Sequence, residues 1–191
     1  GFSLSKIMLE GPEDELKLTA YTQPAILTHS VALFDKLQKE NIKVARVLGH
    51  SVGEYAALVA AKVLSFEDAV LAVHLRGKYM QEAVPVGAGK MIAVMRVPAA
   101  TIEQACLESS TDSEQVMPAN YNEPGQIVIS GHAAACERAV KWLETNFTET
   151  HRCVELNVSA PFHSTLMKPA ALKLAEHFKT IQFSANEIPY I

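Results

Sequence analysis

The feature that most constrains the fold is a glycine-rich turn, Gly49-His50-Ser51-Val52-Gly53, which lies between a strand-like run and a helical run. Residues 44–48 have strand composition, and residues 54–63 are typical of a helix. Gly-x-Ser-x-Gly between a strand and a helix is the pattern of a nucleophile elbow, in which the serine occupies a strained turn. We expect both glycines to supply the room that this turn needs. A plain helix start capped by Ser51 fits the same residues.

A serine at such an elbow needs further groups before it can act as a nucleophile. We expect the Val52 backbone N–H to be free to stabilise an oxyanion, and Ser51 to require a general base. Among the seven histidines, His163 is the best candidate because it follows Pro161-Phe162 in an irregular stretch before a helix. An imidazole in a loop can reach another element. The other histidines are expected to be turn, surface or packing residues: His29, His50, His74, His132, His151 and His177.

Arg76 is the charged residue least consistent with its surroundings. It lies in a helix expected over residues 65–84, which opens with Ser65-Phe66-Glu67-Asp68, a sequence that resembles a capping box. At about 100° per residue, Arg76 falls within the apolar face of this helix. A guanidinium keeps its charge and is costly to bury without an anion. An internal ion pair with an Asp or Glu and a bidentate contact with a substrate carboxylate both fit this position.

Prolines and glycines at residues 85–89 end the expected helix, and the order of expected elements changes after them. After them the order of elements is that of a small βαββαβ, ferredoxin-like unit. We expect strands at 91–97, 115–120, 126–130 and 152–157, with helices at 99–109 and 132–146. Elsewhere we expect a helix with Pro24 in its first turn, a last helix at 164–178 and a strand-like end at 187–191. The fold class is therefore α/β.

Composition narrows the function classes. With 191 residues, 49% of them apolar, the chain has enough apolar material for one packed core and argues against several domains. A net charge of -4 provides no basic field for nucleic acid. No apolar run is long enough to cross a membrane, no signal peptide is seen, and the three cysteines are widely spaced, so we expect a cytoplasmic protein with reduced thiols. No metal-ligand spacing or phosphate-binding loop is present in the sequence.

Separated motifs, in this order along the chain, resemble those of malonyl-CoA:acyl carrier protein transacylases. They are Thr22-Gln23-Pro24-Ala25, residues 49–55, residues 76–81, residues 120–126, Pro161-Phe162-His163 and Leu166-Met167-Lys168-Pro169. A colinear match over nearly the whole chain is far more specific than the elbow alone. The resemblance implies a hydrolase-like α/β subdomain formed by residues 1–89 and 158–191. A ferredoxin-like small subdomain, residues 90–157, would be inserted in it.

The resemblance also implies a two-step acyl transfer that needs no cofactor and no metal. Ser51 would attack the thioester of malonyl-CoA, His163 would act as general base and then as general acid, and Arg76 would pair with the malonyl carboxylate. Met80 would contribute to substrate binding. So would Val52 and Phe162, whose identities resemble the malonyl-preferring pattern rather than the methylmalonyl one.

The second substrate implied by the resemblance is the phosphopantetheine thiol of acyl carrier protein, in fatty acid or polyketide biosynthesis. Acyl carrier proteins are acidic, so we expect a local basic patch that involves Lys78, Lys168 or Lys173. We expect the protein to be a monomer.

The chain departs from the family pattern at both ends. It starts after a Gly-Gln-Gly-Ser-Gln type loop that normally supplies the second oxyanion donor, and it ends before the segment that normally orients the histidine. We therefore expect a fragment with little or no transferase activity by itself. Two other interpretations stay open: a serine esterase of the α/β-hydrolase type, and a non-catalytic module that binds a carrier protein.

Overall fold

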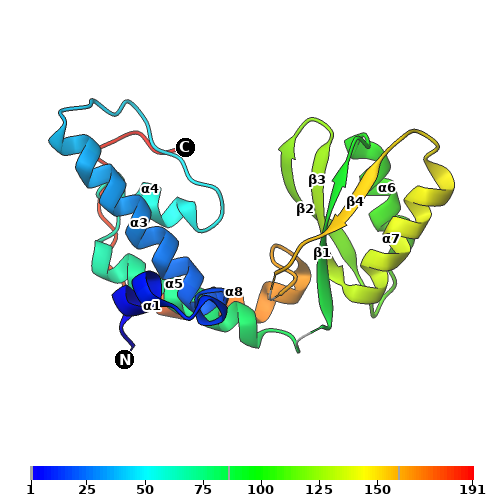
Figure 1. Ribbon diagram of the computed structural model, residues 1–191, viewed down its shortest axis with the longest axis horizontal. Coiled ribbons are helices and arrows are strands. Elements are labelled where there is room, and N and C mark those ends of the chain that lie inside the picture. Colours follow the sequence, from blue (N-terminus) through cyan, green and yellow to red (C-terminus); the bar gives the residue numbers. More distant parts are fainter. Residues whose placement is uncertain (1, 86, 159) are drawn as a thin grey trace. The chain divides into compact units, whose positions relative to one another are not determined.

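The computed structural model describes residues 2–85, 87–158 and 160–191, and the chain divides into two compact units (Figure 1). The first unit is Gly1–Tyr79 with Ala171–Ile191, and the second is Met80–Ala170. The segment that carries His163 therefore belongs to the second unit. The subdomain limits expected from the sequence, 1–89 with 158–191 and 90–157, stay a prediction.

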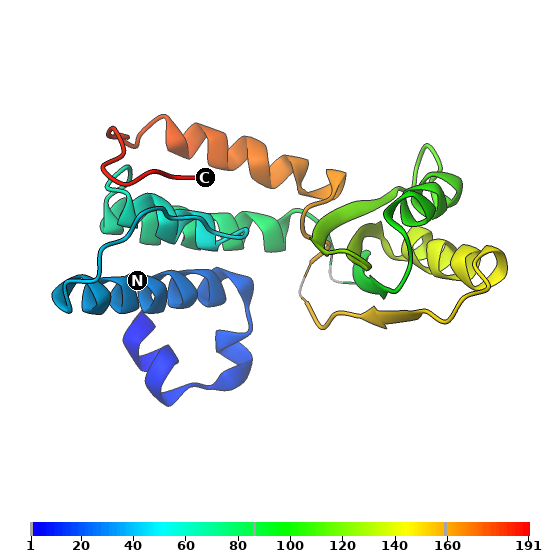
Figure 2. The same cartoon turned by 90° about the horizontal axis from the view of Figure 1, so that it is seen from above.

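The first unit is largely helical. Its helices are α1 (Leu4–Glu10), α2 (Glu13–Leu16), α3 (Thr19–Lys39), α4 (Gly53–Ala60), most of α5 (Phe66–Glu82) and most of α8 (Lys168–Phe178). Figure 2 shows α3 in blue, α4 and α5 in cyan to green, and α8 in orange as rows of helix within this unit. Leu27 of α3 packs with Ala69 and Val73 of α5 in one apolar cluster. No helix in the described part of the chain is both long and apolar enough to cross a membrane.

The strand expected over residues 44–48 is not formed as predicted. Val47 makes a single parallel bridge with Tyr190, in which the Val47 N–H donates to the Pro189 carbonyl at 2.9 Å. The strand-like end expected at 187–191 is likewise reduced to this bridge. A strand needs neighbours along its whole length, and among the described residues this segment has a partner only at Val47.

Pro24 lies inside α3 and not in its first turn as expected, because the helix already begins at Thr19. Proline has no N–H, which leaves the carbonyl four residues earlier, that of Ala20, without its helical donor. The Nδ1 atom of His74 lies 2.9 Å from this carbonyl and donates to it. A Cβ atom added at Gly77 would lie 2.4 Å from the Thr19 carbonyl oxygen. The gap left by the proline and the absent side chain at Gly77 therefore allow α5 to pack closely on α3.

The second unit confirms the predicted βαββαβ order. Its strands β1 (Gly89–Met95), β2 (Val116–Glu123), β3 (Gln126–His132) and β4 (Arg152–Glu155) form an antiparallel sheet in the order β2-β3-β1-β4. Helices α6 (Ala99–Ser109) and α7 (Ala133–Asn146) cover one face of the sheet (Figure 1). The expected helix at 164–178 is divided into a short 3-10 helix, Thr165–Met167, and α8.

Alternation along the strands separates two apolar layers in this unit. Ile92 and Ile129 point into the main core, where they meet residues of α6 and α7. Met91 and Val128 belong to a smaller cluster against which Phe162 packs. Because neighbouring strand residues point to opposite faces, Phe162 lies on the face of the sheet away from α6 and α7.

Candidate active site

Ser51 occupies the strained turn that the elbow pattern predicts. Its φ is +53°, in the left-handed region that non-glycine residues seldom adopt. A Cβ atom at Gly49 would lie 2.0 Å from the carbonyl carbon of Gly53, so only glycine fits at position 49. At Gly53, by contrast, no heavy atom of the described residues lies within 4 Å of an added Cβ, apart from Gly53 itself, its chain neighbours and the adjoining backbone of α4. The expectation that both glycines supply room is therefore confirmed for Gly49 and wrong for Gly53.

The backbone at the start of α4 supports the predicted oxyanion donor. The Gly53 N–H donates to the His50 carbonyl at 3.0 Å, and the Glu54 N–H donates to the Ser51 carbonyl at 3.1 Å. No group in the described segments accepts a hydrogen bond from the Val52 N–H. Val52 is also the N-cap residue, and no side chain caps this helix. The interpretation of Ser51 as a simple helix cap is therefore wrong.

The Arg76 guanidinium reaches the serine from α5. Its Nη2 atom donates to the Ser51 Oγ atom at 3.0 Å, and its Nη1 atom donates to the Gln23 Oε1 atom at 2.6 Å. Its Cζ atom lies 5.9 Å from the ring centre of Tyr55, within cation–π range. Among the described residues no carboxylate lies within 4.0 Å of this guanidinium, so the internal ion pair that was the alternative expectation is not formed there.

Burial shifts the pKa values of Arg76 and of its neighbour Tyr55. The side chain of Arg76 is half-buried, and burial lowers the pKa of its guanidinium, while Tyr55 and Glu54 act in the opposite direction. Burial also raises the pKa of the Tyr55 hydroxyl. Arginine keeps its proton even when its pKa falls, so a positive charge stands beside the serine oxygen. Such a charge favours the negative oxygen that forms when the hydroxyl loses its proton.

Gln23 is a site residue to which sequence reasoning gave no role. Its side chain is 5% exposed and bridges Arg76 to Thr19, whose Oγ1 atom accepts a hydrogen bond from the Gln23 Nε2 atom at 2.9 Å. The signal in the sequence is the spacing of Thr19 and Gln23, four residues apart on one face of a helix. A polar pair at this spacing, beside a helix-interior proline, is a candidate for a buried contact.

The remaining predicted site residues lie in the second unit. His163 has φ +57°, and its side chain is exposed within the described chain. Pro161 is buried against β1, where a Cβ atom at Gly89 would lie 2.3 Å from the Pro161 Cγ atom. The Ser164 hydroxyl donates to the Pro161 carbonyl at 2.7 Å. These contacts fix the loop, while the approach of His163 to Ser51 stays a prediction.

Met80 and Phe162, also expected to bind substrate, are placed in the second unit as well. Met80 is 6% exposed, and Phe162 is half-buried against the cluster of Met91 and Val128. The structure thus brings together Ser51, Val52 and Arg76. Among the described residues, no three His, Cys, Asp or Glu side chains are grouped so that they could hold a metal ion.

Comparison with known proteins decides the family. The model of the family described as "Acyl transferase domain" matches residues 1–191. The chain belongs to this family. It is 47% identical to the malonyl CoA-acyl carrier protein transacylase of Salmonella typhimurium and 46% identical to that of Escherichia coli K12. Each match covers 100% of this chain and 61% of the relative, so the chain spans about three fifths of the relatives' length.

Solved structures agree with this assignment to the acyl transferase domain family. An acyl carrier protein S-malonyltransferase from Vibrio cholerae has a TM-score of 0.94 and 41% identity, covering 100% of this chain and 62% of that one. A type II PKS acyl-carrier protein in complex with its malonyl-transacylase gives a TM-score of 0.94 and 42% identity, with 100% and 61% covered. The resemblance inferred from the motifs and the α/β fold class are thereby confirmed.

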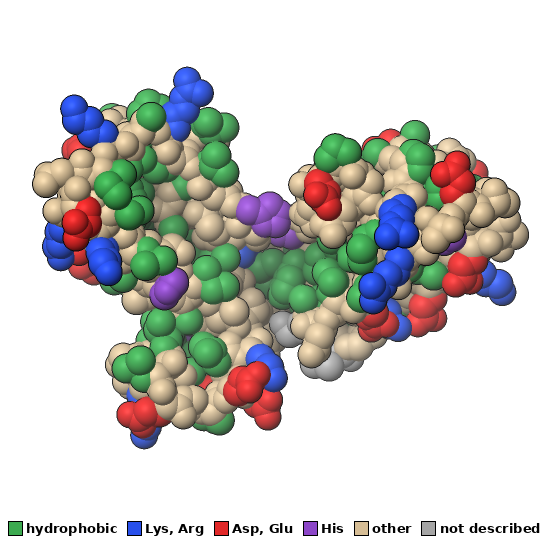
Figure 3. Space-filling model, turned by 45° about the horizontal axis from the view of Figure 1, so that its top comes forward, with side chains coloured by type: hydrophobic (Ala, Val, Ile, Leu, Met, Phe, Trp, Pro, Cys, Tyr) green, Lys and Arg blue, Asp and Glu red, His purple; other side chains and the backbone are tan. Residues whose placement is uncertain are grey.

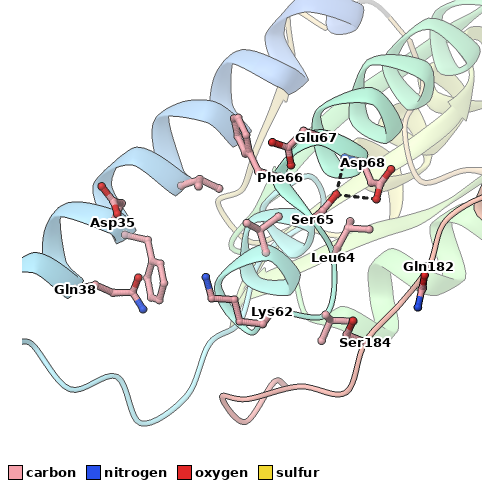
Figure 4. Close-up of a pocket in the computed structure, with 14 residues that line it drawn as sticks. Asp35, Gln38, Lys62, Leu64, Ser65, Phe66, Glu67, Asp68, Gln182 and Ser184 are labelled. Carbon is pink, nitrogen blue, oxygen red and sulfur yellow. Dashed lines mark hydrogen bonds between the residues drawn. The ribbon is translucent and has the colours of Figure 1, made fainter.

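The acyl transferase domain also has a pocket that is separate from these residues. It has a volume of about 580 Å³ and lies in the first unit, between α3, the start of α5 and residues 182–184 (Figure 4). Its charged lining residues are of both signs: Asp35, Lys62, Glu67 and Asp68. None of the site residues predicted from the sequence lines this pocket, so it is not the candidate active site.

Proposed function

We propose that this chain carries the reactive serine of a malonyl-CoA:acyl carrier protein transacylase, which acts in fatty acid or polyketide biosynthesis. The observation that carries the proposal is the environment of Arg76. A half-buried guanidinium lies 3.0 Å from the Ser51 Oγ atom and has no carboxylate partner among the described residues. A planar guanidinium pairs well with a carboxylate, so a malonyl group would supply the missing anion at the reacting atom.

The reaction would proceed through two displacements at one carbonyl carbon. In the first, the Ser51 oxygen attacks the malonyl thioester while His163 takes its proton, the C–S bond breaks, and the proton passes to the departing CoA thiolate. In the second, His163 takes the proton of the carrier thiol, whose sulfur attacks the malonyl-Ser51 ester. The serine oxygen leaves and regains a proton. The Val52 N–H stabilises the oxyanion in both steps.

Substrate choice is proposed to depend on Val52, Met80 and Phe162. Phe162 and Met80 are large apolar side chains whose positions are fixed by packing, so they would limit the space available beside the malonyl group. We propose malonyl over methylmalonyl on this basis. We also propose that the reaction needs no cofactor and takes place in the cytoplasm, with the protein as a monomer.

The proposed second substrate is acyl carrier protein, approached through basic side chains. Lys78 and Lys173 are exposed in the first unit, and the Lys173 Nζ atom lies 5.3 Å from the ring centre of Tyr79. Lys168 is exposed in the second unit. On the face shown in Figure 3, basic and acidic side chains are interspersed. Charge reversal at these lysines should raise KM for the carrier and leave malonyl loading unchanged.

The test measures intact mass after prolonged incubation of the chain with malonyl-CoA, so that a single slow loading event is detected even though the chain by itself is expected to transfer little or no malonyl. We expect one malonyl adduct that is absent from Ser51→Ala. Arg76→Ala should weaken malonyl loading by about 10- to 100-fold, since a hydrogen bond to a charged group contributes about 1.5–3 kcal/mol. Arg46→Ala is the matched control, because Arg46 is exposed in the same unit. An adduct that survives Ser51→Ala would refute the proposal.

The same experiment separates the alternatives. Rapid hydrolysis of neutral p-nitrophenyl esters, without malonyl transfer, would identify an esterase. Carrier binding that persists in Ser51→Ala, with no adduct on the unaltered serine, would identify a binding module.

A further inference from the structure

The Arg76 guanidinium donates to two side chains, Ser51 and Gln23, and Gln23 is itself held by a further hydrogen bond. One guanidinium nitrogen faces the Ser51 Oγ atom at 3.0 Å, and the other donates to the Gln23 Oε1 atom at 2.6 Å. A carboxamide has an oxygen end and an NH₂ end of nearly equal size. Only the oxygen end can accept from a guanidinium, so the orientation of the Gln23 side chain decides whether this contact exists.

Arg76, which can only donate, selects that orientation, and Thr19 holds the other end of the amide in place. The Thr19 Oγ1 atom accepts a hydrogen bond from the Gln23 Nε2 atom at 2.9 Å, and Thr19 and Gln23 are only 7% and 5% exposed. With the NH₂ end directed to Thr19, the oxygen end faces Arg76. If the amide were reversed, its NH₂ group would point at a cation and its oxygen would lose the arginine donor. Inside the protein, where water cannot replace a missing partner, that exchange is unfavourable.

The backbone of Thr19 is fixed to the helix that carries Arg76. Gly77, the next residue after Arg76, lies so close to the Thr19 carbonyl oxygen that an added Cβ atom would be 2.4 Å from it. On the same helix, the His74 Nδ1 atom donates to the carbonyl of Ala20 at 2.9 Å. The first turn of α3 is therefore docked on α5 on both sides of Arg76, so the Thr19 hydroxyl has a defined position relative to the guanidinium.

We infer that Thr19 is a positioning residue, which orients Arg76 toward Ser51 through the Gln23 carboxamide. The structural part stands on these contacts alone, and its consequence for malonyl binding rests on the proposed function. Thr19 makes no hydrogen bond to Ser51 or to the Arg76 guanidinium in the described structure. Loss of the Thr19 hydroxyl removes one of the hydrogen bonds that hold the amide, so the guanidinium should rotate more readily and bind a substrate carboxylate less well.

The experiment compares two isosteric substitutions in α3 of the full chain. Thr19→Val removes the acceptor for Gln23. Thr22→Val is the matched control, because the Thr22 hydroxyl lies 2.5 Å from the Leu16 carbonyl oxygen and 3.0 Å from that of Leu18, so it donates to the backbone and not to Gln23. Thr19→Ser restores the hydroxyl. NMR of ¹⁵N-arginine-labelled protein reports the Arg76 Nη atoms, which give separate signals only when rotation of the guanidinium is slow.

We expect separate Arg76 Nη signals in the unaltered protein, Thr22→Val and Thr19→Ser, and merged signals in Thr19→Val. KM for malonyl-CoA should rise about tenfold in Thr19→Val, while kcat changes little, because a carboxylate contact acts in both the ground state and the transition state. Unchanged signals in Thr19→Val would overturn the inference, and so would equal changes in Thr22→Val. If the signals merge in Thr19→Val but the unaltered protein never loads malonyl, the positioning role is supported and the proposed function is refuted.

Gln23→Glu provides a second test if Thr19→Val does not fold. It keeps the shape of the side chain and places a carboxylate 2.6 Å from the Arg76 Nη1 position. Arg76 then has an internal anion, so malonyl loading should fall by about 10- to 100-fold while the Nη signals stay separate. Malonyl loading equal to that of the unaltered protein would contradict the role of Gln23 as the link.

Discussion

The two glycines of the elbow should respond in opposite ways to alanine. A Cβ atom at position 49 would lie 2.0 Å from the Gly53 carbonyl carbon and 2.3 Å from the Glu54 nitrogen. These are backbone atoms that no side-chain rotation can move. The elbow would have to open by about 1.4 Å, to the 3.4 Å of an ordinary contact. Overpacking of this kind costs about 1–3 kcal/mol of stability.

The larger effect of Gly49→Ala should be on the serine. A shift of about 1 Å at a reacting group can cost about 100-fold in rate. Such a shift would also break the 3.0 Å contact between the Ser51 Oγ and Arg76 Nη2 atoms. Gly53→Ala adds a Cβ atom in open space at the first residue of α4, so it should stabilise the protein by about 0.4–1 kcal/mol.

Labelling of Ser51 by a fluorophosphonate, together with thermal unfolding, measures both effects in the full chain. We expect labelling to fall about 100-fold in Gly49→Ala and to change less than threefold in Gly53→Ala. Gly53→Ala is therefore the matched control within the motif. The reasoning is refuted by Gly49→Ala labelling at the rate of the unaltered protein, or by equal losses in both variants.

Other predictions concern stability. Ser65→Ala should lower the free energy of unfolding in urea by about 1 kcal/mol, because the Ser65 Oγ atom accepts a hydrogen bond from the Asp68 N–H at 3.0 Å at the start of α5. Ser3→Ala should be nearly neutral, because the Ser3 side chain makes no such bond at the start of α1. Gly131→Ala should cost about 1–3 kcal/mol, since its Cβ atom would lie 2.1 Å from the Gln115 carbonyl oxygen; a neutral result contradicts this. Burial raises the pKa of Cys106 to about 12, so stability should fall as pH rises from 9 toward 12, and the slope should be shallower in Cys106→Ala.

The sign of the Cys106 effect follows from where the proton binds. The folded protein keeps the thiol neutral up to a pKa of about 12, whereas the unfolded chain loses this proton near 9.0. Above pH 9 the unfolded state therefore binds fewer protons than the folded state, and deprotonation favours unfolding. Equal slopes in the unaltered protein and Cys106→Ala would show that this thiol does not contribute.

The second unit could be predicted well from the sequence because its elements contact one another locally. Strand alternation and helix periodicity are sufficient when each strand has a neighbour close along the chain, as β2 and β3 have across the turn at Pro124-Gly125. The strand expected at 44–48 fails for the opposite reason. Its composition is strand-like, but a ladder requires partners, and only Val47 has one among the described residues.

A candidate site residue could be predicted from the sequence where the residues next to it in the chain dictate its conformation. Ser51 was found because a strained turn needs glycine close by, and the positive φ of Ser51 shows that strain. The pattern alone could not tell the two glycines apart, since the crowding at Gly49 comes from how the turn folds back on the start of α4.

Helical periodicity could predict the face on which Arg76 lies but not the groups that it contacts. The helical angle placed the guanidinium on the apolar face, which is correct, but an angle about one helix axis says nothing of the groups that another element brings to that face. Here α3 brings an amide and the elbow brings a hydroxyl, and both are neutral. Neutral partners satisfy the N–H donors of a guanidinium without cancelling its charge. The charge is therefore not cancelled within the described residues, which is the condition that the proposed pairing of Arg76 with a malonyl carboxylate requires.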